Sequence, residues 1–225
     1  ISWFVNYITD DGFIYVIRNG GSDHIIAPST RVNIHTKGGI VKGVFGWPAI
    51  HTRKGKNLDM APSMENICID VGAKTKAEIL EMGIHVGCVA TYQDEFSELN
   101  NNFYCGRALD NRMGGYCIAE VARMLKEKKK KLPFTLYIVN SVQEEIGLRG
   151  SVATTYAVEP HIGIAIDVTH ALDIPDANKR KFGDVRLGDG PVIVRGPNVN
   201  PKVFSRLVEV AKKHKIPHQI AASGV

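Results

Sequence analysis

Phe134-Thr135-Leu136-Tyr137-Ile138-Val139 is a nearly unbroken apolar run of strand length, and it decides the fold class that the sequence predicts. Such a run is typical of a strand that is buried on both faces of a sheet. Apolar residues recur at helical spacing over 112–128 before it, and a second run of strand character lies at 161–167. With a short helix expected over 147–156, the order strand, helix, strand predicts a βαβ unit whose two strands are parallel.

The residues before this unit indicate a small β-rich module. Asp11-Gly12 stands between two apolar runs and predicts a β-hairpin. Gly38-Gly39 predicts a second hairpin within 31–46, and 86–92 has the composition of another strand. Short strands separated by glycines at this spacing are typical of a compact β unit.

Two further helices are predicted from their capping residues. Thr75 and Glu78 have the spacing of a capping box, which predicts a helix over 76–82 that ends before Gly83. Asn200-Pro201 combines a capping residue with proline at the first helical position. The chain is therefore predicted to be α/β, with a mixed sheet, flanking helices and the β-rich module.

The composition indicates an ordinary globular protein. The chain has 225 residues, of which 44% are hydrophobic and 23% are charged. No apolar run approaches the roughly 20 residues that a membrane-spanning helix needs, and the first residues do not resemble a signal peptide. The formal charge of +5 is concentrated in Lys126 and 128–131 at a predicted helix end, without interleaved aromatic residues. We therefore expect neither a nucleic-acid partner nor a membrane.

The cysteines point to a reducing compartment. Cys68, Cys88, Cys105 and Cys117 form no C-x-x-C pair and have no zinc-knuckle spacing. Free thiols are the expected state, which favours a cytoplasmic protein.

Four acids fall at the ends of the predicted strands and at a strand-to-helix turn. Glu144 and Glu145 follow the strand that starts at Phe134, Asp167 ends the strand at 161–167, and Asp110 precedes the helix at 112–128. Ligands of open α/β sheets bind beyond the carboxyl ends of the strands. Four carboxylates in one crevice would repel each other, and divalent cations are the usual compensation. The pattern predicts a carboxylate-rich metal site.

An ordinary alternative stays open for each acid. Asp110 could cap its helix, and the two glutamates could pair with Arg107, Arg112 or Arg149. Carboxylates alone would suit magnesium or manganese, whereas added histidines would shift the choice to zinc or cobalt. His170, three residues after Asp167, is expected at the surface or behind the ligands.

Three ordered motifs resemble a known family. They are G-R-A-L-D-N-R-x-G at 106–114, Q-E-E-I-G-L-R-G at 143–150 and I-D-V-T at 166–169. Their order and spacing are similar to those of the dinuclear metallo-aminopeptidases of the tetrahedral (TET) type, which include glutamyl and deblocking aminopeptidases. The resemblance covers 103–171, and the β-rich segment before it matches the family's inserted dimerisation domain.

The resemblance implies a cytoplasmic hydrolase with a zinc-exopeptidase-like catalytic domain. It divides the chain into 1–11, the start of the catalytic domain; 12–93, the β-rich dimerisation domain; and 94–225, the rest of the catalytic domain. It also implies a homo-oligomer in which dimers build a dodecamer, with a peptide as the substrate.

By position, the resemblance gives each acid a role. Asp110 would bridge two divalent metal ions, and Glu145 and Asp167 would each bind one of them. Zinc or cobalt is expected. Glu144 would remain off the metals as the general base that takes a proton from the attacking water. The protease would then release N-terminal residues from peptides.

The family also supplies two histidine ligands that have no counterpart here. One comes from an H-x-D motif before the inserted domain, and the other follows a G-T-D segment near the C-terminus. We expect the sequence to be part of a longer protein that contains both. Their roles are not transferred to His24, His170 or His218.

Two other functions compete with the aminopeptidase. Relatives of the family have been labelled cellulases, and Glu144 with Asp110 or Asp167 could serve a glycoside hydrolase. Such an enzyme should also have aromatic sugar platforms, and only Phe103 and Tyr104 lie near the acids in the sequence. Alternatively, the β-rich module is an assembly or peptide-binding domain on an inactive scaffold. Its interface would then contain the loop residues Trp47, Pro48, Ile50 and His51.

Overall fold

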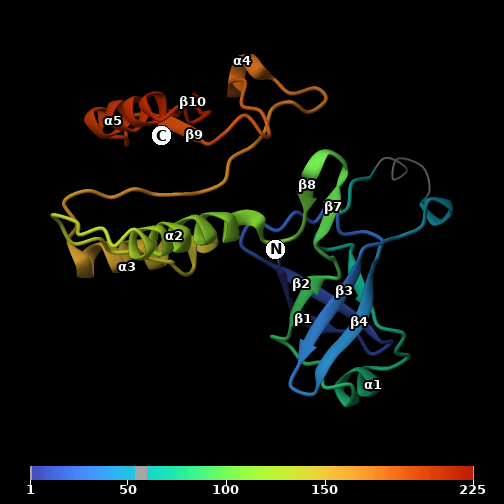
Figure 1. Cartoon of the computed structure of the whole chain (residues 1–225). Helices are drawn as coiled ribbons and strands as arrows, with labels where there is room; N and C mark the ends of the chain where they lie inside the picture. Colours follow the sequence, from blue (N-terminus) through green and yellow to red (C-terminus); the bar gives the residue numbers. More distant parts are fainter. Residues whose placement is uncertain (1, 54–59, 225) are drawn as a thin grey trace. The chain divides into compact units, whose positions relative to one another are not determined.

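The computed structural model describes residues 2–53 and 60–224 of the chain. The chain divides into two compact units, Ile1–Ala165 and Ile166–Val225 (Figure 1). Both units contain helices and sheets. Within the described ranges, none of the helices combines the length and the apolar character that a membrane crossing requires.

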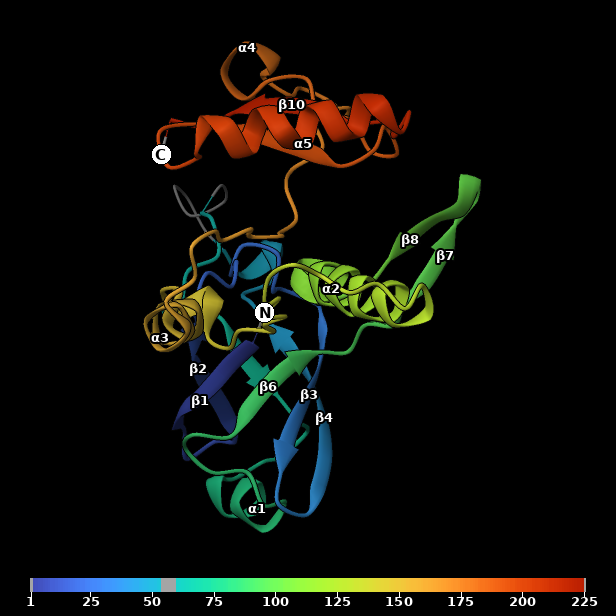
Figure 2. The ribbon, with the colours of Figure 1, turned by 60° about the vertical axis from the view of Figure 1, so that its left-hand side comes forward.

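A closed β-barrel forms the first part of unit Ile1–Ala165 (Figure 2). Neighbouring strands are antiparallel, and the order around the barrel is β1-β2-β5-β4-β3-β6. The strands are β1 (Ser2–Ile8), β2 (Phe13–Asn19), β3 (Arg31–Thr36), β4 (Gly39–Gly46), β5 (Cys68–Asp70) and β6 (Val89–Tyr92). A 3₁₀ turn η1 (Ile50–Thr52) follows β4, and helix α1 (Lys76–Glu81) precedes β6.

The interior of the barrel is a continuous apolar core. The Trp3 ring meets Phe45 edge-on at 5.3 Å and Tyr92 at 6.2 Å between ring centroids. Aromatic pairs prefer this edge-to-face arrangement. Alternate residues of the strands point inward, as the period of a strand requires. The buried apolar residues are Trp3, Val5, Ile8, Ile14, Val16, Ala27, Val32, Ile34, Phe45, Ile67, Ile69, Ile79, Ile84, Cys88 and Ala90.

The local predictions for this module are confirmed. β1 and β2 form the hairpin predicted at Asp11-Gly12, where Gly12 has φ +87°, and β3 and β4 form the hairpin predicted around Gly38-Gly39. α1 begins at the predicted cap, because the Thr75 hydroxyl accepts a hydrogen bond from the Glu78 N–H. The Glu78 carboxylate reaches back to the Lys74 N–H at 2.9 Å, one residue before the cap.

Strand β1 lies in the barrel, although we expected residues 1–11 to begin the catalytic domain. Trp3 pairs with Arg18 of β2 on one side and with Ala90 of β6 on the other. The barrel closes through β1, so Ser2–Ile8 belongs to the β-rich module. The functional division into 1–11, 12–93 and 94–225 stays a prediction.

A hairpin and two helices follow the barrel in the same unit. They are β7 (Ser97–Leu99), the turn η3 (Asn100–Asn102), β8 (Phe103–Cys105), α2 (Leu109–Glu127), the turn η4 (Glu144–Ile146) and α3 (Arg149–Val158). The helices expected over 112–128 and 147–156 are thus confirmed, with shifted ends.

The prediction that two parallel strands form a βαβ unit at 134–139 and 161–167 is wrong. Neither 134–139 nor 161–167 is a strand, and their apolar side chains are exposed. A strand of a parallel sheet requires neighbours and covering helices on both faces. In the described part of the chain no strand pairs with either segment, and the backbone of both segments is irregular.

Unit Ile166–Val225 contains the parallel pair that the structure does form. β9 (Val192–Arg195) and β10 (Gln219–Ala222) pair in parallel, and α5 (Pro201–Lys213) connects them; a short helix α4 (Lys179–Phe182) lies earlier. The predicted cap of α5 is confirmed, because Asn200 Oδ1 accepts from the Lys202 N–H at 2.9 Å. The βαβ connection therefore lies nearer to the C-terminus than expected.

Candidate metal and catalytic site

Asp110 lies where the chain turns into α2, outside the regular helix. Ala108 adopts a left-handed conformation with φ 62°, Asp110 is extended with φ −83° and ψ 111°, and the peptide bond between Asp110 and Asn111 is cis. Regular helical geometry starts at Arg112, whose N–H donates to the Ala108 carbonyl at 3.3 Å. The Asp110 residue is exposed and precedes the helix, where negative charge is favoured by the helix dipole.

The helix cap next to Asp110 is Asn111. Its Oδ1 accepts a hydrogen bond from the Gly114 N–H at 2.8 Å. A Cβ on Gly114 would stand 2.5 Å from Asn111 Oδ1, so a larger residue at 114 would displace the cap. The possibility that Asp110 caps this helix is wrong, and its carboxylate is not used for that purpose. The sequence interpretation missed this role of Asn111, although asparagine three residues before a backbone donor is a capping signal.

Glu144 and Glu145 share the turn η4. The turn is closed by the N–H groups of Gly147 and Leu148, which donate to the Glu144 carbonyl at 3.0 and 2.9 Å. Both glutamates are exposed. The Gly150 N–H donates to the Val142 carbonyl at 2.9 Å, and a Cβ on Gly150 would meet that oxygen at 2.3 Å. The glycine thus allows α3 to start directly behind the acidic turn.

Asp167 belongs to the second compact unit, two residues after the division at Ala165. Its Oδ1 accepts a hydrogen bond from the Val168 N–H at 2.8 Å, and its side chain is exposed. His170 is exposed as well, in agreement with a surface position. Asp173 accepts from the Leu187 N–H at 3.3 Å, which is a structural contact.

The described structure brings two of the four acids together. Glu144 and Glu145 are neighbours in η4, whereas Asp110 lies at the start of α2 and Asp167 lies in unit Ile166–Val225. Across residues 2–53 and 60–224, no three His, Cys, Asp or Glu side chains are close enough to hold a metal ion. Carboxylate oxygens are donors that suit a divalent cation.

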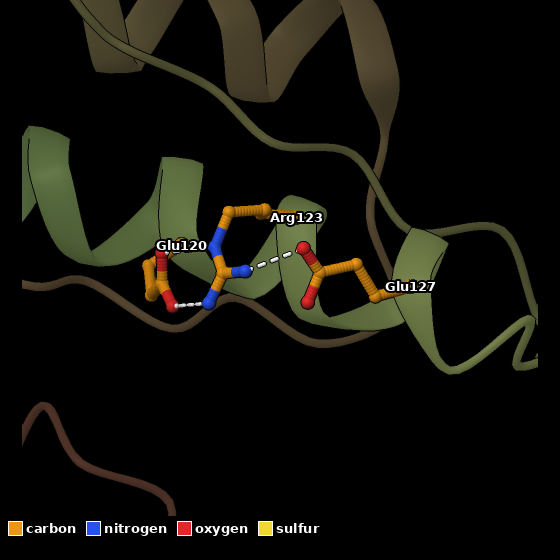
Figure 3. Close-up of polar contacts among 3 residues, drawn as sticks. All are labelled: Glu120, Arg123 and Glu127. Atoms are coloured by element: carbon orange, nitrogen blue, oxygen red, sulfur yellow. Dashed lines mark hydrogen bonds and ion pairs between the residues drawn. The ribbon is translucent and has the colours of Figure 1, made fainter.

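One of the three arginines considered as partners of these acids, Arg107, has another partner. Arg107 Nε donates to Asp94 Oδ1 at 2.8 Å, so Arg107 is held by an acid that the alternative did not consider. Farther along α2, Arg123 lies between Glu120 and Glu127, and it donates to Glu127 Oε1 at 2.5 Å (Figure 3). The hydrogen bond from Arg123 lowers the pKa of the Glu120 carboxyl. This surface trio is separate from the four acids of the motifs.

The loop after β4 is partly packed on its own barrel. Trp47 contacts the barrel core, and its Nε1 donates to Asn66 Oδ1 at 3.1 Å. The Arg53 guanidinium lies 4.0 Å from the centre of the Trp47 ring. Ile50 and His51 are exposed. Trp47 is therefore packed on its own barrel, whereas the interface role of this loop stays a prediction.

Comparison with known proteins places the three motifs in a family. The family described as M42 glutamyl aminopeptidase matches residues 1–225. The chain is 37% identical to the lysyl aminopeptidase of Pyrococcus furiosus over 228 residues, which covers 99% of this chain and 63% of the relative.

Solved structures agree with that match. An aminopeptidase of the archaeon Desulfurococcus kamchatkensis has a TM-score of 0.85 and 36% identity, and the similarity covers 98% of this chain and 61% of that one. A TET1 peptidase of Pyrococcus horikoshii, which can assemble into a tetrahedron or a large octahedral shell, has a TM-score of 0.76 and 27% identity, with 100% and 66% covered.

The fold of these neighbours is the mixed α/β fold of the TET aminopeptidases, as the sequence predicted. The chain spans about three fifths of the length of the curated relatives that it matches, for example 63% of the lysyl aminopeptidase. Because the family matches the chain over its whole length, and a relative is 37% identical across 99% of it, the chain belongs to the M42 glutamyl aminopeptidase family.

Proposed function

We propose that the chain carries the acidic catalytic residues of a metal-dependent aminopeptidase, a hydrolase that removes N-terminal residues from peptides. The observation that carries the proposal is family membership along the whole chain, including the segments that contain Asp110, Glu144, Glu145 and Asp167. The aminopeptidase names of the relatives support the same reaction class.

Three acids would hold two divalent cations, with zinc or cobalt expected. Asp110 would bridge the ions, and Glu145 and Asp167 would each bind one. When bound, such a pair of ions acidifies water and polarises the scissile carbonyl. The extended backbone at Asp110 supports its part, since its carboxylate is exposed and Asn111 performs the capping.

Glu144 would act as the general base. It would accept a proton from the attacking water at its carboxylate and deliver that proton to the leaving amine. Its position supports this separation of roles, because Glu144 and Glu145 lie side by side in one turn and can serve different atoms. An exposed carboxylate is also accessible to solvent water.

The barrel would dimerise, and dimers would build a dodecamer in the cytoplasm. The support is the likeness to TET peptidases, one of which was solved as a dodecamer. A glycoside hydrolase and an inactive scaffold remain the competing functions.

The full-length protein tests the proposal with aminoacyl-nitroanilide substrates, with and without a chelator, beside soluble cellulose. We expect release of nitroaniline that the chelator abolishes and that added zinc or cobalt restores. Peptidase activity that resists the chelator would contradict the metal mechanism. Hydrolysis of cellulose without hydrolysis of the peptide substrate would contradict the function.

A further inference from the structure

The hairpin of β7 and β8 forms a separate two-stranded ribbon, which follows the barrel and precedes α2 in the chain (Figure 2). Ser97 pairs with Cys105, and Leu99 pairs with Phe103. In the described part of the chain each strand pairs only with the other, so the outer edge of β8 is open. Open edges bind additional strands.

The base of the hairpin is fastened by two contacts. Asp94 binds Arg107 at 2.8 Å across its two ends, and the rings of Phe96 and Tyr104 stack with centroids 5.4 Å apart. Gly106 lies beneath Phe96, where a Cβ would stand 3.2 Å from the ring. A two-stranded hairpin alone is marginally stable, and these contacts hold its two strands together.

The hairpin presents exposed apolar side chains on both faces. Phe96 and Tyr104 share one face and are 66% and 56% exposed, and Leu99 and Phe103 share the other. Because side chains alternate along a strand, a peptide added to β8 would place every second side chain on the face that carries Tyr104.

The direction of β8 leads towards the catalytic motif. β8 ends at Cys105, and Asp110 follows five residues later. A peptide whose amino end lies at Asp110 and whose remaining residues lie along β8 runs opposite to the strand. Such a peptide is antiparallel, which is the arrangement that pairs most readily.

The charge of the hairpin favours a cationic occupant over a second copy. Residues 93–107 contain three acids, Asp94, Glu95 and Glu98, and one arginine, Arg107, which Asp94 already binds. Glu95 and Glu98 are exposed. Two copies would bring these acids together, whereas a peptide with a free amino group or lysine side chains is attracted to them.

We propose that the open edge of β8 binds the peptide substrate downstream of its first residues, as an antiparallel added strand with an apolar or basic side chain beside Tyr104. The inference rests on the proposed aminopeptidase function. Backbone hydrogen bonds supply affinity for any extended peptide, and Tyr104 with Glu98 supplies the side-chain preference.

The test compares two substrates of the full-length protein that share their first residue, an aminoacyl-nitroanilide and a hexapeptide. The measured quantity is the ratio of kcat/KM for the hexapeptide to kcat/KM for the nitroanilide. We expect Tyr104→Ala to lower this ratio about three- to tenfold, mainly through KM, because an aromatic contact is lost. Leu99→Ala, on β7 and on the opposite face, is the matched control and should keep the ratio within about twofold.

Two altered peptides test the added strand itself. N-methylation of one downstream backbone nitrogen should lower kcat/KM about two- to tenfold at one of two adjacent positions, because alternate N–H groups face β8. Replacing a downstream lysine with glutamate should lower it as well, less so in high salt.

The outcomes separate the two proposals. Wild-type protein that cleaves neither substrate would overturn the proposed function and this inference with it. Wild-type protein that cleaves both, with an unchanged ratio in Tyr104→Ala, would overturn the β8 site alone. An altered oligomer size of Tyr104→Ala in light scattering, with the ratio unchanged, would instead assign the hairpin to contacts between copies.

Discussion

The barrel at residues 2–92 and the acid-bearing segment at 106–165 both contain short apolar runs between turns. The apolar side chains of these runs are buried in the barrel and exposed in the segment. In the barrel these runs enclose a core that includes Trp3 and Phe45. Along 134–139 the apolar side chains are exposed, with Tyr137 at 60%. Every buried apolar side chain described for unit Ile1–Ala165 belongs to the barrel. Asp110, Glu144 and Glu145 are thus carried by backbone outside that core.

The difference lies in whether the described residues supply pairing partners for the apolar run. The β1–β2 and β3–β4 hairpins are joined by tight turns, and closure of the barrel satisfies every strand edge. A parallel strand at 134–139 would need distant partners and covering helices. Stability and catalysis should therefore respond to mutations in different places.

Glu144→Gln should have the largest effect, and only on activity. We expect kcat to fall about 10²- to 10⁴-fold, because a general base contributes that much. The thermal midpoint should stay unchanged, since Glu144 is exposed. Steady-state kinetics and thermal unfolding measure the two effects. Glu159→Gln, an exposed acid after α3, is the control. Full activity of Glu144→Gln would refute its role as the base.

Trp3→Ala should have the largest effect on stability. Removing this fully buried ring leaves a cavity beside Phe45 and Tyr92 and should cost about 3–5 kcal/mol. Tyr137→Ala in the exposed run should change the unfolding free energy by less than about 0.5 kcal/mol. Denaturant titration measures both. Equal losses from the two substitutions would show that the two regions do not differ in packing.

Thr75→Ala should have a smaller effect within the barrel module. The Thr75 hydroxyl caps α1 by accepting from the Glu78 N–H, and losing a cap costs about 1 kcal/mol. Thr75→Ser keeps the acceptor and should recover most of the loss. Urea unfolding of both variants gives the comparison. If alanine and serine destabilised the protein equally, the capping hydrogen bond would not be responsible.

Arg123→Ala should have the smallest effect, and it should depend on pH. Arg123 holds the pKa of Glu120 below its ordinary value. A carboxyl with a lowered pKa stabilises the fold above its unfolded pKa, and this contribution is lost as the pH falls through the folded value. The variant should therefore differ from wild type at pH 7 and converge with it in acid. An NMR titration should show a higher Glu120 pKa in the variant, and an unchanged value would argue against the contact in Figure 3.

Turn residues and capping residues in the sequence correctly predicted the hairpins and the helix starts, because these features depend on neighbouring residues. Asp11-Gly12 marks its hairpin because glycine accepts the positive φ there, and Asn200-Pro201 starts its helix with a side-chain acceptor. Closure of the barrel through β1 was not foreseen, because pairing between Trp3 and Ala90 leaves no short-range pattern. The same limit explains the wrong parallel pair at 134–139 and 161–167.

For the candidate site, the sequence located the acids but not their surroundings. The motif 106–114 contains Asp110, and the structure adds that Asn111 caps the helix and that Gly114 makes room for it. Such contacts follow from backbone geometry, which a list of residue types does not contain. The role of Glu144 is a prediction that Glu144→Gln tests, and the metal binding expected of Asp110, Glu145 and Asp167 is a prediction that the chelator assay tests.

The pairing of β1 with β6 has a consequence for protein engineering. Trp3 lies opposite Ala90 and Phe4 opposite Val89, so the chain enters and leaves the barrel on adjacent strands. A host whose insertion point is a few ångströms wide can accept such a module without being stretched. We therefore expect that the barrel at 2–92 can be exchanged as a single segment, because its first and last strands lie side by side.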